Sequence, residues 1–64
     1  METGTVKFYN EEKGFGFIVD SGSKEEIFVH KTGLVDIIRE GDSVTFEKTQ
    51  GKKGMNATDV RLAN

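Results

Sequence analysis

Turn-forming residues divide this sequence into short segments. Clusters that combine Gly with Asp, Ser, Glu or Lys occupy residues 11–14, 20–23, 39–42 and 50–54, and such clusters mark turns. The segments between them are rich in Val, Phe, Ile and Thr, which favour strands. We therefore predict strands at residues 3–10, 14–20, 26–30, 42–49 and 55–62. Short strands at this spacing are typical of an all-β sandwich or barrel, and a barrel leaves no strand edge exposed.

Segment 31–39 is the one stretch that does not fit the strand pattern. Leu34, Ile37 and Ile38 have the i, i+3, i+4 spacing of one helix face. The segment is nevertheless too short to form a stable helix by itself. We expect a helical turn, or an apolar loop that closes one end of the barrel.

The length of 64 residues and the absence of cysteine limit how the chain is stabilised. We expect one domain, 1–64, of a size that buries only roughly 60% of its unfolded surface. With no cysteine and a single histidine, the chain offers neither a disulfide nor a credible zinc site, so we expect no metal and no cofactor. Its stability must come from a compact core.

Charge and hydropathy narrow the class of protein further. No stretch approaches the roughly 20 apolar residues of a membrane span, and the N-terminus does not resemble a signal peptide. We therefore expect a cytoplasmic protein that does not act at a membrane. The net charge is −2, so an anionic partner has to meet a local basic patch.

Phenylalanines are predicted to gather on the outer face of two neighbouring strands. Strand side chains alternate between two faces. One face of the strands at 14–20 and 26–30 carries aliphatic side chains and glycines, namely Ile18, Ile27, Val29, Gly14 and Gly16. The other face carries rings, namely Phe15, Phe17, Phe28 and His30. A buried His30 with an unpaired ring nitrogen costs about 1–3 kcal/mol, so the aliphatic face is predicted to be the core.

The alternative arrangement places the phenylalanines in the core. It would expose Ile18, Ile27 and Val29 and would bury the histidine. An exposed aromatic patch is rare on a soluble monomer unless it is a binding site. Each exposed Phe also forgoes about 1.5–3 kcal/mol of burial, so an outward-facing patch indicates a function other than folding.

Basic residues and glycines surround the predicted patch. Gly14 and Gly16 permit sharp bending and a close approach of two strands. The lysines interleave with the aromatic residues, namely Lys7 before Phe8, Lys13 before Phe15, Lys31 after His30, and Lys52 and Lys53 in a hairpin loop. Cations for phosphates and flat rings for bases are what binding of a single-stranded nucleic acid requires.

Two motifs in this order resemble the cold-shock domain, a five-stranded antiparallel OB-fold barrel. Residues 13–18, Lys-Gly-Phe-Gly-Phe-Ile, are similar to its first ribonucleoprotein motif, and residues 27–30, Ile-Phe-Val-His, to its second. Residues 4–10 are similar to its opening strand and residues 40–42 to its turn into the fourth strand. RNA-recognition motifs share the first motif, but they carry the second motif first and contain two helices that this sequence lacks.

The resemblance implies a protein that binds single-stranded RNA and DNA, as an RNA chaperone affecting transcription and translation. We expect a monomer, although an exposed phenylalanine patch could also pair two chains. The resemblance implies base stacking on Phe8, Phe15, Phe17, Phe28 and His30. It implies contacts to backbone or base edges from Lys7, Asn10, Lys13 and Lys53. It also implies a core of Val6, Tyr9, Ile18, Ile27, Val29, Val44, Phe46, Ala57 and Val60.

Several residues depart from the family pattern. Phe8 replaces a tryptophan, Tyr9 a phenylalanine, and Met55 a proline. Lys31 replaces the aromatic residue that usually follows the histidine, and the next loop is short and without aromatics. Each lost stacking ring is worth about 1–3 kcal/mol. We expect a shorter footprint or weaker binding, which a phosphate contact from Lys31 partly offsets.

Two other functions are weaker interpretations. An aromatic patch can dock a proline-rich peptide, but such grooves tend to use Tyr and Trp, and the lysines would be unexplained. An enzyme is disfavoured, because His30 shows no sign of a catalytic triad. Residues 51–54 also lack the phosphate-loop pattern, so we expect no small-molecule substrate.

Overall fold

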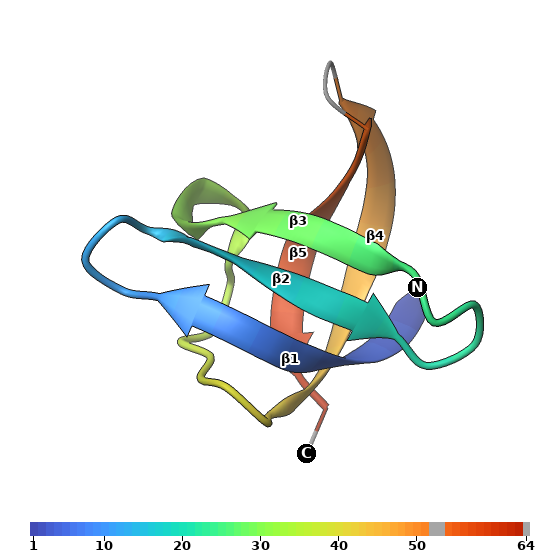
Figure 1. Ribbon diagram of the computed structural model, residues 1–64, viewed down its shortest axis with the longest axis horizontal. Helices are drawn as coiled ribbons and strands as arrows, with labels where there is room; N and C mark the ends of the chain where they lie inside the picture. The colour runs from blue at the N-terminus through green and yellow to red at the C-terminus, as the bar shows by residue number, and fades with distance from the viewer. Residues whose placement is uncertain (52–53, 64) are drawn as a thin grey trace.

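Five strands form a closed barrel in the computed structural model, which describes residues 1–51 and 54–63. The strands are β1 (Glu2–Asn10), β2 (Phe15–Asp20), β3 (Glu26–His30), β4 (Ser43–Gly51) and β5 (Gly54–Leu62). A short 3-10 helix, η1 (Lys31–Gly33), follows β3. The strand boundaries predicted from sequence agree with these to within two residues. Figure 1 shows β1, β2 and β3 side by side on one face, with β4 and β5 behind them.

The order of strands around the barrel is β1-β2-β3-β5-β4. β1 pairs with β2 and with β4, β2 pairs with β3, and β4 pairs with β5, all antiparallel. β3 and β5 are parallel, with Phe28 opposite Asn56 and Val29 opposite Ala57. The all-β barrel expected from sequence is therefore confirmed, and this parallel pairing is the one departure from a wholly antiparallel sheet.

The barrel interior is filled by aliphatic side chains and one phenylalanine. The buried hydrophobic residues are Val6, Ile18, Ile27, Val29, Ile38, Val44, Phe46, Ala57 and Val60. All but Ile38 belong to the predicted core. Tyr9, which was predicted there too, is half-buried and packs against the core from its margin. A phenol hydroxyl is costly to bury without a partner, so a marginal position suits it.

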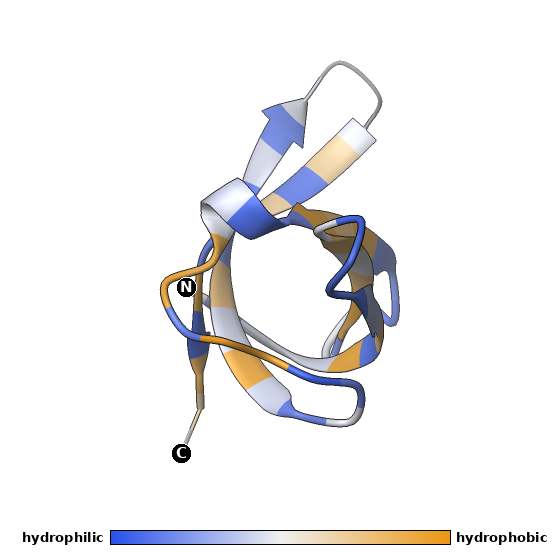
Figure 2. Cartoon of the chain, turned by 90° about the vertical axis from the view of Figure 1, so that its left-hand side faces the viewer, coloured by the Kyte–Doolittle hydropathy of each residue, from blue (hydrophilic) through white to orange (hydrophobic). Residues whose placement is uncertain are grey.

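In segment 31–39 the residues whose spacing suggested a helix lie in an apolar loop, which is the second of the two expected alternatives. The one helical turn, η1, precedes them at Lys31–Gly33. The loop is tied to β5, because Leu34 forms a parallel bridge with Val60 and the Val35 N–H donates to the Val60 carbonyl at 2.8 Å. Figure 2 shows this segment along the rim of one barrel end. Ile38 is fully buried while Ile37 is 79% exposed, so the loop contributes one core side chain.

Gly16 lies opposite Tyr9, where the backbone of β1 passes close to that of β2. A Cβ at this position would collide with the Phe8 carbonyl oxygen and would lie 2.7 Å from the Tyr9 Cα. Both obstacles are backbone atoms, which cannot rotate away as the end of a side chain can. The predicted role of this glycine, a close strand approach, is therefore seen directly.

We expect Gly16→Ala to destabilise the protein by about 1–3 kcal/mol or more, as overpacking does. Gly22→Ala is the control, because a Cβ there meets only the Asp20 Oδ1 at 3.3 Å. Urea unfolding of the three proteins checks this. Equal stability of Gly16→Ala and the wild type would contradict the close approach.

An ion pair between the buried Asp20 and the partly exposed Lys48 joins the β2–β3 turn to β4. Asp20 is 3% exposed, and its Oδ1 accepts the N–H groups of Gly22 (2.7 Å) and Ser23 (3.1 Å). Its Oδ2 lies 2.9 Å from the Lys48 Nζ. The hydrogen bond from Lys48, with those of Ser23 and Gly22, holds the pKa of Asp20 below its usual 3.8 despite burial. The same hydrogen bond raises the pKa of Lys48 above its usual 10.5.

These two pKa shifts predict stability losses at both extremes of pH. The pKa of Asp20 is lower in the folded protein than in the unfolded chain, where it is 3.8, so ionised Asp20 stabilises the fold above pH 3.8. This stabilisation is lost as the pH falls through the pKa of the folded state. The pKa of Lys48 is higher in the folded protein than in the unfolded chain, where it is 10.5, so charged Lys48 stabilises the fold below pH 10.5. This stabilisation is lost as the pH rises through the pKa of the folded state. We expect Asp20→Asn to lower the thermal midpoint at neutral pH and to flatten the acid limb, as measured by melting between pH 2 and pH 8.

The control is Glu12→Gln, which removes an exposed carboxylate from a turn. The difference in midpoint between wild type and Asp20→Asn should vanish at the acid end. A difference that stays constant with pH would show that the charge of Asp20 is not what stabilises the turn.

Candidate nucleic-acid interface

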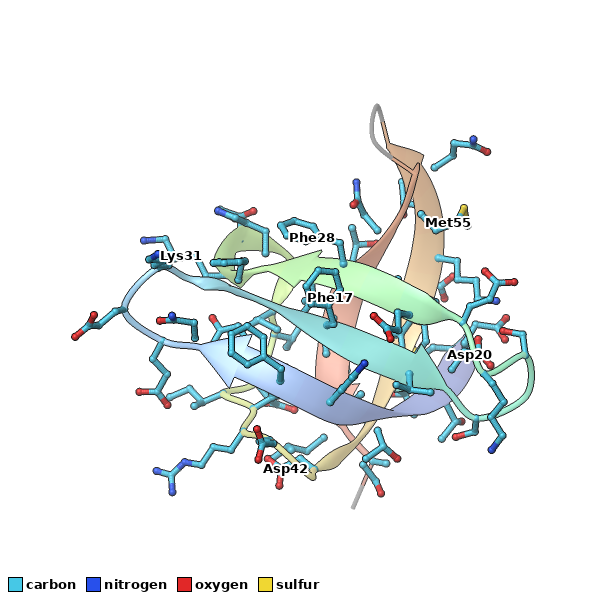
Figure 3. All side chains as sticks on the ribbon, in the orientation of Figure 1. Phe17, Asp20, Phe28, Lys31, Asp42 and Met55 are labelled. Atoms are coloured by element: carbon cyan, nitrogen blue, oxygen red, sulfur yellow. The ribbon has the colours of Figure 1, made fainter. Side chains whose placement is uncertain are left out.

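Phenylalanine side chains from β1, β2 and β3 gather on the outer face of these strands. Phe17 lies opposite Phe28, and Phe15 lies opposite His30. Figure 3 shows Phe17 and Phe28 projecting from neighbouring strands on the same face. On the β1 side, Phe8 lies opposite Phe17. We call Phe8, Phe15, Phe17 and Phe28 the ring cluster.

The four rings of the ring cluster form a continuous row of contacts, in the order Phe8, Phe15, Phe28, Phe17. The ring centroids of Phe8 and Phe15 are 6.3 Å apart and those of Phe17 and Phe28 are 5.9 Å apart, both in edge-to-face geometry. Phe15 and Phe28 join the two pairs, at 6.1 Å and a tilt of 31°. Edge-to-face pairs are worth about 0.5–1.5 kcal/mol beyond burial. The contacts thus order the rings without removing them from solvent.

The exposure of the rings settles which face of the sheet is the core. Phe15, Phe17 and Phe28 are half-buried and Phe8 is 40% exposed. Ile18, Ile27 and Val29 on the opposite face are fully buried. The alternative of a phenylalanine core is therefore wrong for β2 and β3. The predicted position of Phe15, Phe17 and Phe28 on the outer face is confirmed.

A β-bulge at Lys7 turns Phe8 outward. Strict alternation along β1 would place Phe8 on the inner face with Val6, which is buried. The pairing shifts register between these two residues, because Val6 lies opposite Ile18 whereas Phe8 lies opposite Phe17. The extra residue rotates the strand beyond it. The sequence pattern gave no sign of this bulge, and only the family resemblance assigned Phe8 to the interface.

His30 is exposed at the end of β3 and held in a fixed orientation. The Thr32 N–H donates to its Nδ1 at 3.3 Å, and the Thr32 Oγ1 lies 3.0 Å from the same atom. An accepting Nδ1 leaves the proton of the neutral ring on Nε2. The ring therefore presents a flat face and an N–H donor beside Phe15.

The predicted lysines fall into different situations. The Lys7 Nζ lies 2.6 Å from the Glu26 Oε2, and both side chains are about half exposed. Lys13 and Lys31 are exposed, and within the described part of the chain neither has a carboxylate within 4.0 Å. Lys53, like Lys52, lies outside the described residues. The ion pair of Lys7 was not anticipated, because its partner is 19 positions away.

Asn10 shapes the turn between β1 and β2. Its Oδ1 accepts the Lys13 N–H at 3.1 Å, and its carbonyl accepts the Gly14 N–H at 2.8 Å. Its side-chain amide group is left to contact a ligand. The residue thus positions Lys13 at the margin of the ring cluster, in addition to the contact role predicted for it.

The structure adds β5 residues that sequence reasoning did not assign to the interface. Asn56 lies opposite Phe28 in the parallel pair of β3 and β5. A hollow of about 320 Å³ adjoins the ring cluster there. It is lined by Phe28, His30 and residues of η1, the following loop and β5, including Asn56 and Thr58. This neighbourhood depends on a long-range strand pairing, for which the local sequence carries no signal.

The described residues offer no sign of a metal centre or a membrane span. No group of at least three His, Cys, Asp and Glu side chains among them is arranged to hold a metal ion. No helix in that part of the chain is long and apolar enough to cross a membrane.

Comparisons with known proteins agree with this geometry. Residues 2–63 match the family model of the 'Cold-shock' DNA-binding domain. A cold shock protein of Arthrobacter globiformis is 47% identical, over 97% of this chain and 98% of that protein. The cold shock-like protein CspA of Stigmatella aurantiaca is 45% identical, over 95% of this chain and 96% of that protein.

A solved structure shares the fold. Drosophila Unr CSD456 superposes with a TM-score of 0.78 at 27% identity, over 98% of this chain. The chain spans 26% of that protein's chain. Together with the family-model match over nearly every residue, the ring cluster and the closed barrel lead to one conclusion. The chain belongs to the cold-shock domain family of nucleic-acid-binding proteins.

Proposed function

We propose that this protein binds single-stranded RNA and DNA as a monomer, by stacking bases on the ring cluster and His30. In this role it acts as an RNA chaperone that keeps transcripts unstructured in the cytoplasm and so affects transcription and translation. The observation that carries the proposal is the ring cluster itself, four phenylalanines in contact on one outer face and each at least partly open to solvent. Binding, not catalysis, is its activity.

Stacking explains why the ligand is single-stranded. A base inside a duplex has both faces covered by its neighbours, whereas an unpaired base is free to leave the stack and lie on a ring. Every base has such a face, so stacking tolerates different sequences. A protein that binds in this way holds RNA open wherever it is unpaired, which is what a chaperone of RNA structure has to do.

The number of rings limits the strength of binding. Lys31 and a short aliphatic loop stand where the family has aromatic residues, so the stacking surface ends near His30. The hollow beside Phe28 and Asn56 adds polar side chains at that end, where a base edge has room to enter. We infer a short footprint, with the stacked bases over Phe8, Phe15, Phe17, Phe28 and His30.

We expect Phe15→Ala and Phe28→Ala each to weaken oligonucleotide binding by about 1–3 kcal/mol, which is roughly 5- to 140-fold. Both rings are half-buried, so the loss of stability should stay below the ~3–5 kcal/mol typical of a core phenylalanine. Fluorescence titration of a labelled single strand and urea unfolding measure the two effects. A duplex of the same sequence should compete weakly.

Leu62→Ala is the control for loss of a large apolar side chain outside the ring cluster, because Leu62 is 41% exposed on β5. It should leave binding unchanged. Unimpaired binding by both phenylalanine variants, or collapse of the fold in both, would contradict stacking on the ring cluster. Absence of any binding by the wild type at low salt would overturn the proposed function.

The salt dependence of binding reports on the lysines. Release of counterions from a single strand contributes a slope of about −0.7 per neutralised phosphate to log affinity against log salt. The four predicted cations, Lys7, Lys13, Lys31 and Lys53, thus set a limit of about −2.8. Glu26 should make the slope shallower, because its carboxylate already pairs with Lys7.

We expect Glu26→Gln to raise affinity at low salt and to steepen the slope by up to about 0.7. Removing the carboxylate frees the Lys7 ammonium for a phosphate, and an exposed pair costs only ~0.2–1 kcal/mol to lose. In the double variant Glu26→Gln/Lys7→Met the gain should disappear. Weaker binding by Glu26→Gln would instead assign the carboxylate a direct contact with the ligand.

A further inference from the structure

Lys31 occupies a defined place between two elements of the interface. It follows His30 directly and opens η1. Its N–H donates to the Gly14 carbonyl at 2.8 Å, which ties the end of β3 to the turn before β2. Figure 3 shows Lys31 at this end of the sheet, beyond Phe28.

The aliphatic stem of Lys31 lies over Gly14. A Cβ on Gly14 would be 2.8 Å from the Lys31 Cδ, 3.1 Å from its Cγ and 3.4 Å from its Cβ. The stem therefore fills the space that any other residue at position 14 would need. Gly14 also has a φ of +72°, which L side chains rarely adopt. The missing side chain of Gly14 thus forms a seat that limits where the Lys31 ammonium can go.

The Lys31 ammonium is available to an anion. Among residues 1–51 and 54–63, no carboxylate lies within the 4.0 Å of an ion pair to it, in contrast to Lys7 and Lys48. A second hollow, of about 390 Å³, is lined by Lys31 together with the acidic residues Glu11 and Asp36. These carboxylates repel a phosphate, so we place the phosphate on the other side of Lys31, toward its chain neighbour His30 and the Phe15 that pairs with His30 across β2 and β3.

We infer that Lys31, seated on Gly14, is a phosphate subsite next to the base stacked on His30 and Phe15. An ammonium is a compact charge that binds phosphate oxygens and offers no flat face to a base. At this position the strand therefore contributes a phosphodiester and not a stacked base. Gly14 is a positioning residue for that contact. This inference rests on the proposed function and assigns one of its contacts.

The test compares charge and shape at position 31. Lys31→Met keeps an unbranched stem and removes the charge, while Lys31→Phe supplies a ring. Lys24→Met, in the exposed β2–β3 turn, is the control for loss of a surface lysine. The probes are a labelled oligothymidylate and a series in which a single linkage is a neutral methylphosphonate.

We expect Lys31→Met to bind several-fold more weakly at low salt, with a slope shallower by about 0.7. Lys24→Met should match the wild type. One methylphosphonate linkage should weaken the wild type several-fold and leave Lys31→Met unaffected. Lys31→Phe should show the same shallow slope and should gain affinity by stacking on the nearby base. An abasic nucleotide at that place in the oligonucleotide should therefore weaken binding by Lys31→Phe and not by the wild type.

The inference is overturned if Lys31→Met keeps the wild-type slope, or if every methylphosphonate affects the two proteins equally. In either case binding by the wild type would remain, so the proposed function would stand. The seat is tested separately by proton NMR of the free wild type. Nuclear Overhauser contacts between the Gly14 Hα and the Lys31 Hγ and Hδ are expected, and their absence would show that Gly14 does not position the stem.

Discussion

The structure depends on the filling of a very small barrel by aliphatic side chains. A closed sheet of five short strands has room for few side chains, and Ile18, Ile27 and Val29 occupy the part of it beneath β2 and β3. Because strand residues alternate, burying these three side chains sends Phe15, Phe17 and Phe28 outward. The ring cluster is thus the reverse side of the core. A change that reversed the register of either strand would lose both at once.

Two local irregularities of the strands complete the ring cluster that alternation produces. The bulge at Lys7 adds Phe8 to the ring cluster, and the absence of a side chain at Gly16 lets β1 lie close enough for the rings of both strands to meet. The β2–β3 hairpin that carries most of the rings is held at its turn by the Asp20–Lys48 pair. Rings held in this way lose little freedom when a base arrives, which favours stacking over rearrangement.

Lysines lie at the margin of the ring cluster, so the surface combines aromatic rings with positive charge. Lys7 faces Glu26, while Lys13 and Lys31 adjoin the β1–β2 turn, on which Asn10 and Gly14 order them. The net charge of −2 is therefore compatible with an anionic ligand, because the cations that matter are local. Glu11 and Asp36 line a hollow with Lys31, and their carboxylates would repel the phosphates of a strand bound as we propose.

The sequence by itself determined what short-range periodicity can carry. It predicted the five strands, the burial of Ile18, Ile27 and Val29, and the outward face of Phe15, Phe17 and Phe28, since these follow from alternation and turn residues. The rest of the predicted core came from the family resemblance, which also placed the half-buried Tyr9 there. The sequence pattern did not predict the outward turn of Phe8, the burial of Ile38, the Lys7–Glu26 pair or the place of Asn56 beside Phe28. Each of these arises from contacts between distant segments. Only the closing of the barrel brings those segments together, and so only the tertiary structure decided them.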